Sequence, residues 1–145
     1  MILFDANLLV HAHAGRSPFH ETAKRLINKA ADGAIDACLA PQVLCEFFAV
    51  VTNSRLFVPA LSPKEAAGQM AIYWRKSRFQ RVVPKETTIE RLLGLLERHP
   101  VTEQRIFDAF LVATMLDSGV RMIYTQNVKD FEIYPELQVI NPLTQ

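Results

Sequence analysis

Hydrophobic residues follow one another almost without interruption at the start of the chain, over residues 2–10, where only Asp5 and Asn7 break the run. Continuous apolar runs of this kind are typical of strands that are buried on both faces of a parallel sheet. The pattern therefore predicts that residues 2–10 form the first and central strand of such a sheet.

Helical and strand patterns alternate after this run. Ser17 and the proline that follows it predict the start of a helix, whose apolar residues recur at helical spacing until Gly33 ends it. A short apolar segment over residues 34–39 predicts a second strand. Pro41 then predicts the start of a helix that ends near Asn53. Two strands and two helices are thus expected to alternate in the first third of the chain.

The same alternation continues toward the C-terminus. Further helices are predicted from Pro63, around Ile89 to Leu96, and from a cap at Thr102 to about Leu116, and further strands over residues 79–83, 122–125 and 138–140. Parallel neighbouring strands need crossover connections, and helices of these lengths supply them. The sequence therefore predicts an α/β fold: a single domain over residues 1–145, with a central parallel β-sheet flanked by helices on both faces.

Composition restricts the class of protein but does not indicate a function. The 145 residues are 50% hydrophobic and 21% charged, with a formal net charge of +1, so they suit one compact domain and show no basic bias toward nucleic acid. Cys38 and Cys45 lack a CxxC spacing, which predicts buried free thiols in a reducing cytoplasm. No basic leader opens the chain, and no uncharged stretch approaches the ~20 residues of a membrane span. A soluble, cytoplasmic protein without membrane association is expected.

Three acidic residues stand where a hydrophobic core would disfavour them. Asp5 interrupts the most apolar segment of the chain. Glu46 is the only charged residue between positions 43 and 51, and Asp108 is the only one between positions 106 and 116. A buried carboxylate is costly unless it is paired, neutralised or bound to a cation. Each of these acids therefore needs a partner.

Simpler explanations exist for each acid. Asp5 and Asn7 could cap a nearby backbone turn, and Glu46 could point to solvent. Arg105 and Arg121 could pair with the acids in a buried salt-bridge network. The two helical acids, however, have apolar residues three and four positions away, so both predicted helices direct an acid inward.

Acids on separate elements suggest a metal site. In open parallel sheets, ligands bind at the carboxyl ends of the strands, where Asp5 and the turn at Thr125 are predicted to lie. Hard oxygen ligands there suit Mg²⁺ or Mn²⁺, which would support hydrolysis of a phosphodiester. No Walker, GxGxxG or GxSxG pattern offers a competing mechanism. His11 and His13 lack supporting ligands at a suitable spacing, and we assign them no role.

Four segments, in this order, resemble PIN-domain ribonucleases, especially the VapC-type toxins of type II toxin–antitoxin systems. They are Phe4-Asp5-Ala6-Asn7, Glu46 in the helix after the second strand, Ile106-Phe107-Asp108-Ala109, and Tyr124-Thr125-Gln126-Asn127-Val128-Lys129-Asp130-Phe131. The resemblance spans almost the whole chain. It implies a parallel sheet with flanking helices, dependence on Mg²⁺ or Mn²⁺, endonucleolytic cleavage of RNA, a partner antitoxin that blocks the site, and a homodimer.

The resemblance also implies residue roles. By position, Asp5 and Asp108 are similar to the principal metal ligands of the family, and Glu46 completes the acidic triad and could orient a metal-bound water. Asn7 and Thr125 are similar to supporting polar residues around the site.

The fourth acidic position departs from the family pattern. Many relatives have Asp two residues after the threonine, where this chain has Asn127, which can offer an oxygen but no charge. Asp130, three residues further on, either compensates as a fourth catalytic acid or stabilises the terminal turn. One firmly held metal ion is therefore a safer prediction than two.

The densest basic segment, residues 75–81, is the candidate RNA contact. Arg75, Arg78 and Arg81, with neighbouring aromatic residues, could bind phosphates and stack on bases, or could form a solvated helix end. For the homodimer, the apolar residues 56–58 could supply an exposed contact or pack inward.

Two other functions stay open at this point. One is a metal-dependent DNA nuclease or phosphatase that uses the same acids. The other is a degenerate PIN domain that binds RNA or protein without cutting, an alternative that Asn127 leaves open. The retention of three costly acids argues against such decay.

Overall fold

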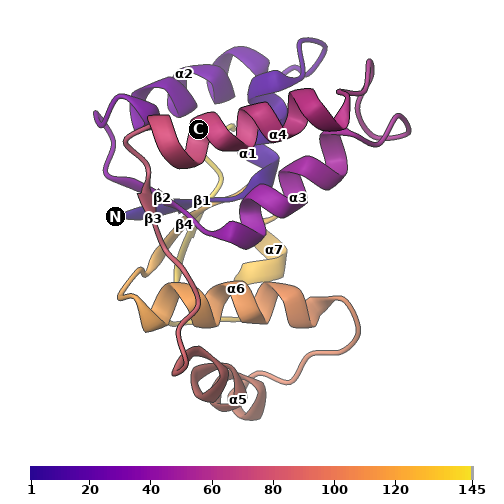
Figure 1. The fold of residues 1–145 in the computed structure, drawn as a ribbon. Helices are drawn as coiled ribbons and strands as arrows, with labels where there is room; N and C mark the ends of the chain where they lie inside the picture. The colour runs from indigo at the N-terminus through magenta and orange to yellow at the C-terminus, as the bar shows by residue number, and fades with distance from the viewer. Residues whose placement is uncertain (145) are drawn as a thin grey trace.

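A five-stranded sheet forms the centre of the computed structural model, which describes residues 1–144 (Figure 1). All neighbouring strands are parallel, and the strand order is β3-β2-β1-β4-β5. The strands are β1 (Ile2–Phe4), β2 (Ala37–Leu39), β3 (Gln80–Arg81), β4 (Met122–Tyr124) and β5 (Gln138–Ile140). The predicted α/β class and parallel sheet are confirmed.

Helices cover both faces of the sheet, as predicted. One layer contains α1 (Ala6–His13), α2 (His20–Ala31), α3 (Pro41–Val51) and α4 (Pro63–Ala71), which continues into a π-helical turn, η1 (Ile72–Lys76). The other layer contains α5 (Thr88–Arg98) and α6 (Arg105–Asp117), and the short α7 (Val128–Phe131) follows β4. Figure 1 shows α1 to α4 above the sheet, and α5 and α6 below it.

The hydrophobic core lies between the sheet and these two layers. Leu3 and Phe4 of β1 and Ile123 of β4 are fully buried, as are Val112 and Met115 of α6. Because apolar residues fill both faces of the central strands, the polar residues that follow β1 and β4 gather at the carboxyl edge of the sheet.

The prediction of a strand over residues 2–10 is wrong for the residues after Phe4. β1 ends at Phe4, and Asp5 is the N-cap of α1, where its side chain accepts a hydrogen bond from the Ala6 N–H at 2.7 Å. Leu8 and Leu9, which suggested a longer strand, are buried on this helix instead. An apolar run alone does not distinguish a buried strand from a short buried helix. Asp5 therefore does cap a turn of the backbone, the first turn of α1.

Several local start and stop signals predicted the ends of helices correctly. Pro41 begins α3, and Ser62 caps α4 through a capping box with Glu65. Gly33 follows α2 with a φ of 81°, a conformation that glycine adopts without steric cost. Thr102, in contrast, does not cap the next helix: α6 begins at Arg105 and has no side-chain cap hydrogen bond.

Two further predictions need correction or refinement. Cys38 is buried as predicted, but Cys45 is exposed, because it lies on the outer side of α3. In the segment proposed as a dimer contact, Leu56 and Val58 are 64% and 60% exposed, whereas Phe57 packs inward at 7%. Only part of that segment is therefore available for contact.

No helix among residues 1–144 combines the length and apolar character needed to cross a membrane.

Candidate active site

Asp5 lies at the carboxyl end of β1, beside the end of β4. The parallel register pairs Phe4 with Tyr124, and the Asp5 N–H donates to the Tyr124 carbonyl at 3.0 Å. Asp5 is only 5% exposed. Its Oδ1 accepts the Ala6 N–H, and its Oδ2 accepts the Thr125 hydroxyl, both at 2.7 Å. Neutral donors from two elements thus fix this carboxylate in place.

Asn7 and Thr125 connect Asp5 to the turn after β4. The Asn7 amide donates to Asp5 Oδ2 and to Thr125 Oγ1, each at 3.2 Å. Asn7 Oδ1 accepts the Gln126 N–H at 3.1 Å, and Thr125 Oγ1 accepts the Asn127 N–H at 3.0 Å. The two residues predicted to support the site therefore hold the buried acid and the turn together.

Glu46 reaches the same region from α3, where it is half-buried. Gln42, one turn earlier, donates from Nε2 to Glu46 Oε1 at 3.3 Å and to the Phe107 carbonyl at 2.8 Å. Phe107 directly precedes Asp108 in the first turn of α6. The Gln42 amide therefore joins α3 to α6 beside both acids.

Asp108 and Asp130 come from α6 and α7, and both are half-buried. Arg105, one turn before Asp108, forms an ion pair with Asp130 at 3.6 Å, with the two side chains 49% and 46% exposed. Asp5, Glu46 and Asp108 form no ion pair with any residue from 1 to 144. The structure thus contains no buried salt-bridge network that would neutralise these acids.

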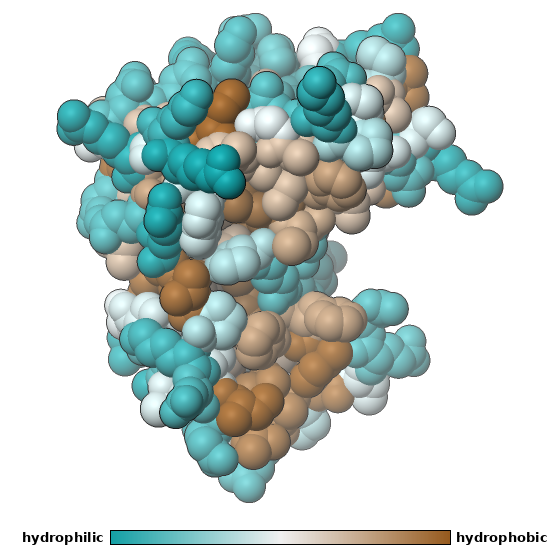
Figure 2. Space-filling model, viewed as in Figure 1, coloured by the Kyte–Doolittle hydropathy of each residue, from teal (hydrophilic) through white to brown (hydrophobic). Residues whose placement is uncertain are grey.

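One pocket of about 300 Å³ brings the predicted acids together. Its lining includes Asp5, Asn7, Glu46, Asp108, Asn127 and Asp130. Thr125 is fully buried among the side chains that support this pocket. Figure 2 shows the surface hollowed between the two helical layers. Residues distant in sequence therefore face one solvent-accessible space.

Burial raises the pKa of the three central acids. For Asp5, burial and the charge of Asp130 outweigh the hydrogen bonds that lower the pKa. Burial and the charges of Asp5 and Asp108 raise the pKa of Glu46. Burial and the charges of Asp130 and Asp5 raise the pKa of Asp108 to about 6, against the opposing charge of Arg105. The pocket therefore carries more negative charge than the neighbouring Arg105 compensates.

This set of donors suits a hard divalent cation. Carboxylate oxygens are the ligands that Mg²⁺ and Mn²⁺ prefer, and a cation would supply the missing positive charge. In the described part of the chain, however, no three His, Cys, Asp or Glu side chains are gathered closely enough to hold an ion. A cation bound by all three carboxylates would therefore require them to lie closer together than they do in this structure.

Comparison with known families identifies the family of the chain. Residues 2–137 match the model of the PIN domain. The chain belongs to the PIN-domain family. Among curated proteins similar to this PIN domain, Ribonuclease VapC24 of Mycobacterium tuberculosis is 25% identical over 144 residues, which cover 99% of this chain and 98% of that protein.

Solved structures similar to this PIN domain include a chain of a toxin–antitoxin complex and a toxin. A chain of a toxin–antitoxin complex from Klebsiella pneumoniae superposes with a TM-score of 0.64 at 18% identity, over 98% of each chain. Mycobacterium tuberculosis VapC20, described as a sarcin–ricin loop cleaving toxin, superposes with a TM-score of 0.64 at 21% identity, over 90% of this chain and 92% of its own. At these identities the two structures show a shared fold. The resemblance to VapC-type PIN domains predicted from the sequence is confirmed.

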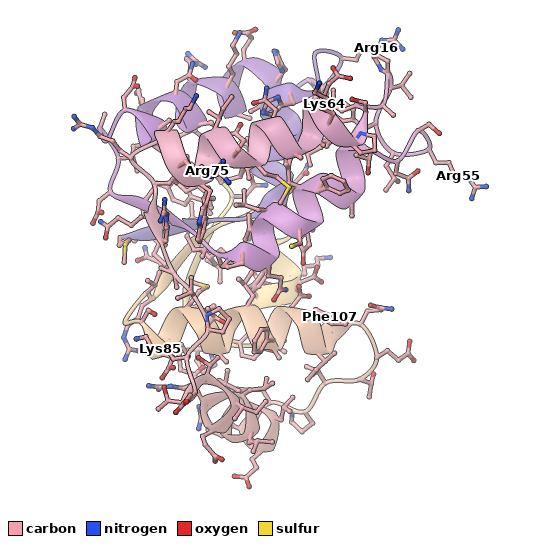
Figure 3. All side chains as sticks on the ribbon, in the orientation of Figure 1. Arg16, Arg55, Lys64, Arg75, Lys85 and Phe107 are labelled. Carbon is pink, nitrogen blue, oxygen red and sulfur yellow. The ribbon has the colours of Figure 1, made fainter. Side chains whose placement is uncertain are left out.

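The basic segment predicted to contact RNA does not line the acidic pocket of this PIN domain. Arg78 packs against Gly33 after α2, and Arg81 lies over the Trp74 ring at 5.0 Å and donates to the Trp74 carbonyl at 2.6 Å. Arg75 lines a separate groove of about 340 Å³ beside α3. In Figure 3, Arg75 lies on the opposite side of the view from the first turn of α6.

Two pocket residues were missed by sequence reasoning. His11, to which we assigned no role, and Gln126 both line the acidic pocket, with His11 Nε2 2.7 Å from Gln126 Oε1. Had residues 6–13 been recognised as a helix, the spacing of four between Asn7 and His11 would have placed them on one face. Arg16 also escaped notice, although it lines an adjoining hollow of about 390 Å³ that shares His11 with the pocket.

Proposed function

We propose that this PIN domain is an endoribonuclease that depends on Mg²⁺ or Mn²⁺ and acts in the cytoplasm as the toxin of a toxin–antitoxin pair. The observation that carries the proposal is the pocket lined by Asp5, Glu46 and Asp108, whose pKa values are raised and which form no ion pair with any residue from 1 to 144. The similarity to Ribonuclease VapC24 supports RNA as the substrate.

The three central acids would hold the metal in different ways. Asp5 would be the fixed ligand, because Thr125 and the Ala6 N–H orient its carboxylate. Asp108 and Glu46 would complete the ligand set from α6 and α3, and Glu46 would also orient the attacking water. A bound Mg²⁺ or Mn²⁺ would neutralise charge on the phosphate and activate water for in-line displacement.

We propose that Asp130, rather than Asn127, supplies the fourth negative charge. The charge of Asp130 acts on both Asp5 and Asp108, where it raises the pKa values. Asn127 is exposed and contributes its backbone N–H to Thr125 Oγ1. Since Asp130 is also paired with Arg105, it is a weaker ligand than the central acids, and a single metal ion is the simplest occupancy.

An assay of purified protein on three substrates tests this function. Labelled structured RNA, duplex DNA and a phosphomonoester are each incubated with Mg²⁺, Mn²⁺ or EDTA. We expect metal-dependent cleavage of RNA that Asp5→Asn reduces at least about 100-fold, because a metal ligand should matter more than the outer partners whose loss costs 10–100-fold. Asp32→Asn, at an exposed position after α2, is the matched control and should cut like the wild type.

The same assay separates the rival functions. Preferential cutting of DNA, or hydrolysis of the phosphomonoester, would favour a DNA nuclease or a phosphatase. RNA binding without cleavage in either metal would favour a degenerate module, and equal cutting by Asp5→Asn and wild type would refute the proposed site. A further variant in which Arg75, Arg78 and Arg81 become Gln should bind RNA more weakly and with a smaller salt dependence; unchanged binding would remove these residues as RNA contacts.

We further propose an antitoxin partner and a homodimer. The structural relative from Klebsiella pneumoniae is described as part of a toxin–antitoxin complex, which supports a protein inhibitor for this chain. For the homodimer, the exposed Leu56 and Val58 offer an apolar contact. Light scattering should give twice the 16.4 kDa mass of the chain, and a monomer at working concentration would contradict the dimer.

A further inference from the structure

His11 and Gln126 form a polar bridge across the rim of the acidic pocket. His11 lies in the last turn of α1, and Gln126 lies in the turn between β4 and α7. His11 Nε2 and Gln126 Oε1 are 2.7 Å apart, and His11 Nδ1 is 2.7 Å from the hydroxyl of Ser17. Both ring nitrogens are therefore engaged, and the ring packs edge-on against Phe19 at 5.3 Å. The imidazole has one defined orientation.

The partners of His11 determine which nitrogen carries the proton. The carbonyl oxygen of the Gln126 side chain can only accept, so Nε2 must donate to it. Ser17 Oγ already accepts the Phe19 N–H at 3.0 Å, and its own proton is available for Nδ1. An imidazole with a proton on Nε2 can make both of these hydrogen bonds. In this tautomer His11 binds the oxygen end of the Gln126 carboxamide.

This orientation leaves the Gln126 amide nitrogen without an acceptor among residues 1–144. The side chain lines the pocket that otherwise presents the carboxylates of Asp5, Glu46 and Asp108. A neutral N–H donor at this rim matches an oxygen of the anionic substrate, because it adds attraction to phosphate without competing for the metal ligands.

We propose that Gln126 is a substrate-binding residue that donates a hydrogen bond to a non-bridging oxygen of the RNA phosphodiester, and that His11 is the positioning residue that directs its amide nitrogen into the pocket. This inference rests on the proposed ribonuclease function and deepens it. In this proposal the carboxylates of the acidic pocket bind the cation, and Gln126 in the turn after β4 binds the phosphate.

A purely structural role explains the bridge less well. The backbone of the turn is already held by the Gln126 N–H, which donates to Asn7 Oδ1, and by the Asn127 N–H, which donates to Thr125 Oγ1. His11 and Gln126 are both only half-buried. The backbone hydrogen bonds already hold the turn, and the specific effect of the side-chain bridge is to set which end of the carboxamide faces His11.

Two pairs of substitutions test the proposal. In the first, His11→Gln keeps a donor near the position of Nε2, whereas His11→Asn keeps polarity near Nδ1 and cannot reach Gln126. In the second, Gln126→Glu keeps an acceptor for His11 but replaces the amide nitrogen with a charged oxygen, and Gln126→Met removes both groups. Kinetics on a short single-stranded RNA in Mg²⁺, Mn²⁺ binding by calorimetry, and melting temperature are measured for each.

We expect His11→Asn and Gln126→Met to raise KM roughly 10-fold, the loss typical of one hydrogen bond to a charged group, with kcat changed less. Gln126→Glu should raise KM further, because it adds repulsion, and His11→Gln should stay within about threefold of wild type. Mn²⁺ affinity and melting temperature should be unchanged in His11→Asn and Gln126→Met.

Several results would overturn the inference. KM at the wild-type value in Gln126→Met and Gln126→Glu would exclude the substrate contact, even if a His11 variant failed to fold. Equal impairment of His11→Gln and His11→Asn would show that the imidazole matters for packing rather than for its hydrogen bond. A wild-type protein that does not cleave RNA would refute the proposed function, and the inference with it, whereas an active wild type with unchanged variants refutes the inference alone.

Discussion

The two walls of the acidic pocket are built differently. On the strand-end wall, Asp5 is nearly fully buried and its two oxygens accept hydrogen bonds from Ala6, Thr125 and Asn7. On the helix wall, Glu46 and Asp108 are half-buried. The only hydrogen bond to either carboxylate from a side chain in the described residues is the long one, 3.3 Å, from Gln42 to Glu46.

This difference assigns different tasks to the two walls. The strand-end wall is pre-organised, because its donors hold Asp5 in one orientation whether or not a cation is present. The helix wall carries acids whose pKa values are raised by burial and by the other carboxylates. A bound cation would therefore affect the helix wall more than the strand-end wall.

Among changes to the residues that surround the acids, removing a donor from the strand-end wall should have the largest effect. Thr125→Val deletes the hydroxyl that donates to Asp5 Oδ2 and that accepts from Asn7 and Asn127. Loss of an outer partner of a metal ligand typically costs about 10–100-fold in activity or metal affinity, and we expect a loss of kcat/KM in that range. Cleavage of RNA at saturating Mg²⁺ measures it.

Thr114→Val is the matched control for this substitution. Thr114 is as deeply buried as Thr125, at 2% against 0% exposed, but its hydroxyl donates to the Phe110 carbonyl within α6. Its removal should leave kcat/KM within about twofold of wild type. Equal losses in the two variants would mean that Thr125 acts through stability, and an unchanged Thr125→Val would show that Asp5 needs no fixed orientation.

Asp108 in the helix wall should make the stability of the metal-free protein depend on pH, in a direction that its raised pKa determines. The pKa of Asp108 is raised from 3.8 to about 6, so the folded protein binds this proton more tightly than the unfolded chain. Without metal, the free energy of unfolding should therefore fall as pH rises through this window, and stay reduced above it. Asp108→Asn should raise the stability of the metal-free protein by roughly 1 kcal/mol at about pH 7.5, a value reduced for solvent screening of a half-buried charge.

Asp117 provides a control of opposite sign on the same helix. Hydrogen bonds from Thr87 and Thr88 lower its pKa, so it stabilises the fold above its ordinary pKa, and this stabilisation is lost as pH falls. Asp117→Asn should therefore lower the stability at neutral pH, where Asp108→Asn raises it. Urea denaturation in EDTA measures both. A destabilised Asp108→Asn would contradict the view that this acid lacks a compensating charge.

Much of the fold was predictable because its signals are local. Pro41 and the Ser62 capping box start helices through contacts within one turn, and apolar runs mark the strands. The second half of the first predicted strand failed because a short buried helix and a strand share the same apolar run, and only the cap at Asp5 distinguishes them.

The acidic part of the pocket was predictable for a different reason. A carboxylate in an apolar segment is costly, so Asp5, Glu46 and Asp108 stood out without any knowledge of their contacts. The contact between His11 and Gln126 could not be found this way, because it joins neutral residues 115 positions apart. Likewise, no local pattern indicates that the arginines of the basic segment lie away from the pocket.

Removing the hydrogen bonds by which Gln42 joins α3 to α6 should have the smallest of the predicted effects. Gln42→Leu removes the amide that donates to Glu46 and to the Phe107 carbonyl, so the helix wall should become less ordered while Asp5 stays fixed. A net contribution of about 1 kcal/mol predicts a roughly fivefold weaker affinity for Mn²⁺. Gln69→Leu on α4, which removes a glutamine that does not line the pocket, should leave the affinity unchanged. If Gln42→Leu binds Mn²⁺ as tightly as wild type, the packing of α3 against the rest of the layer is sufficient to position Glu46, and the two walls differ less than their hydrogen bonds suggest.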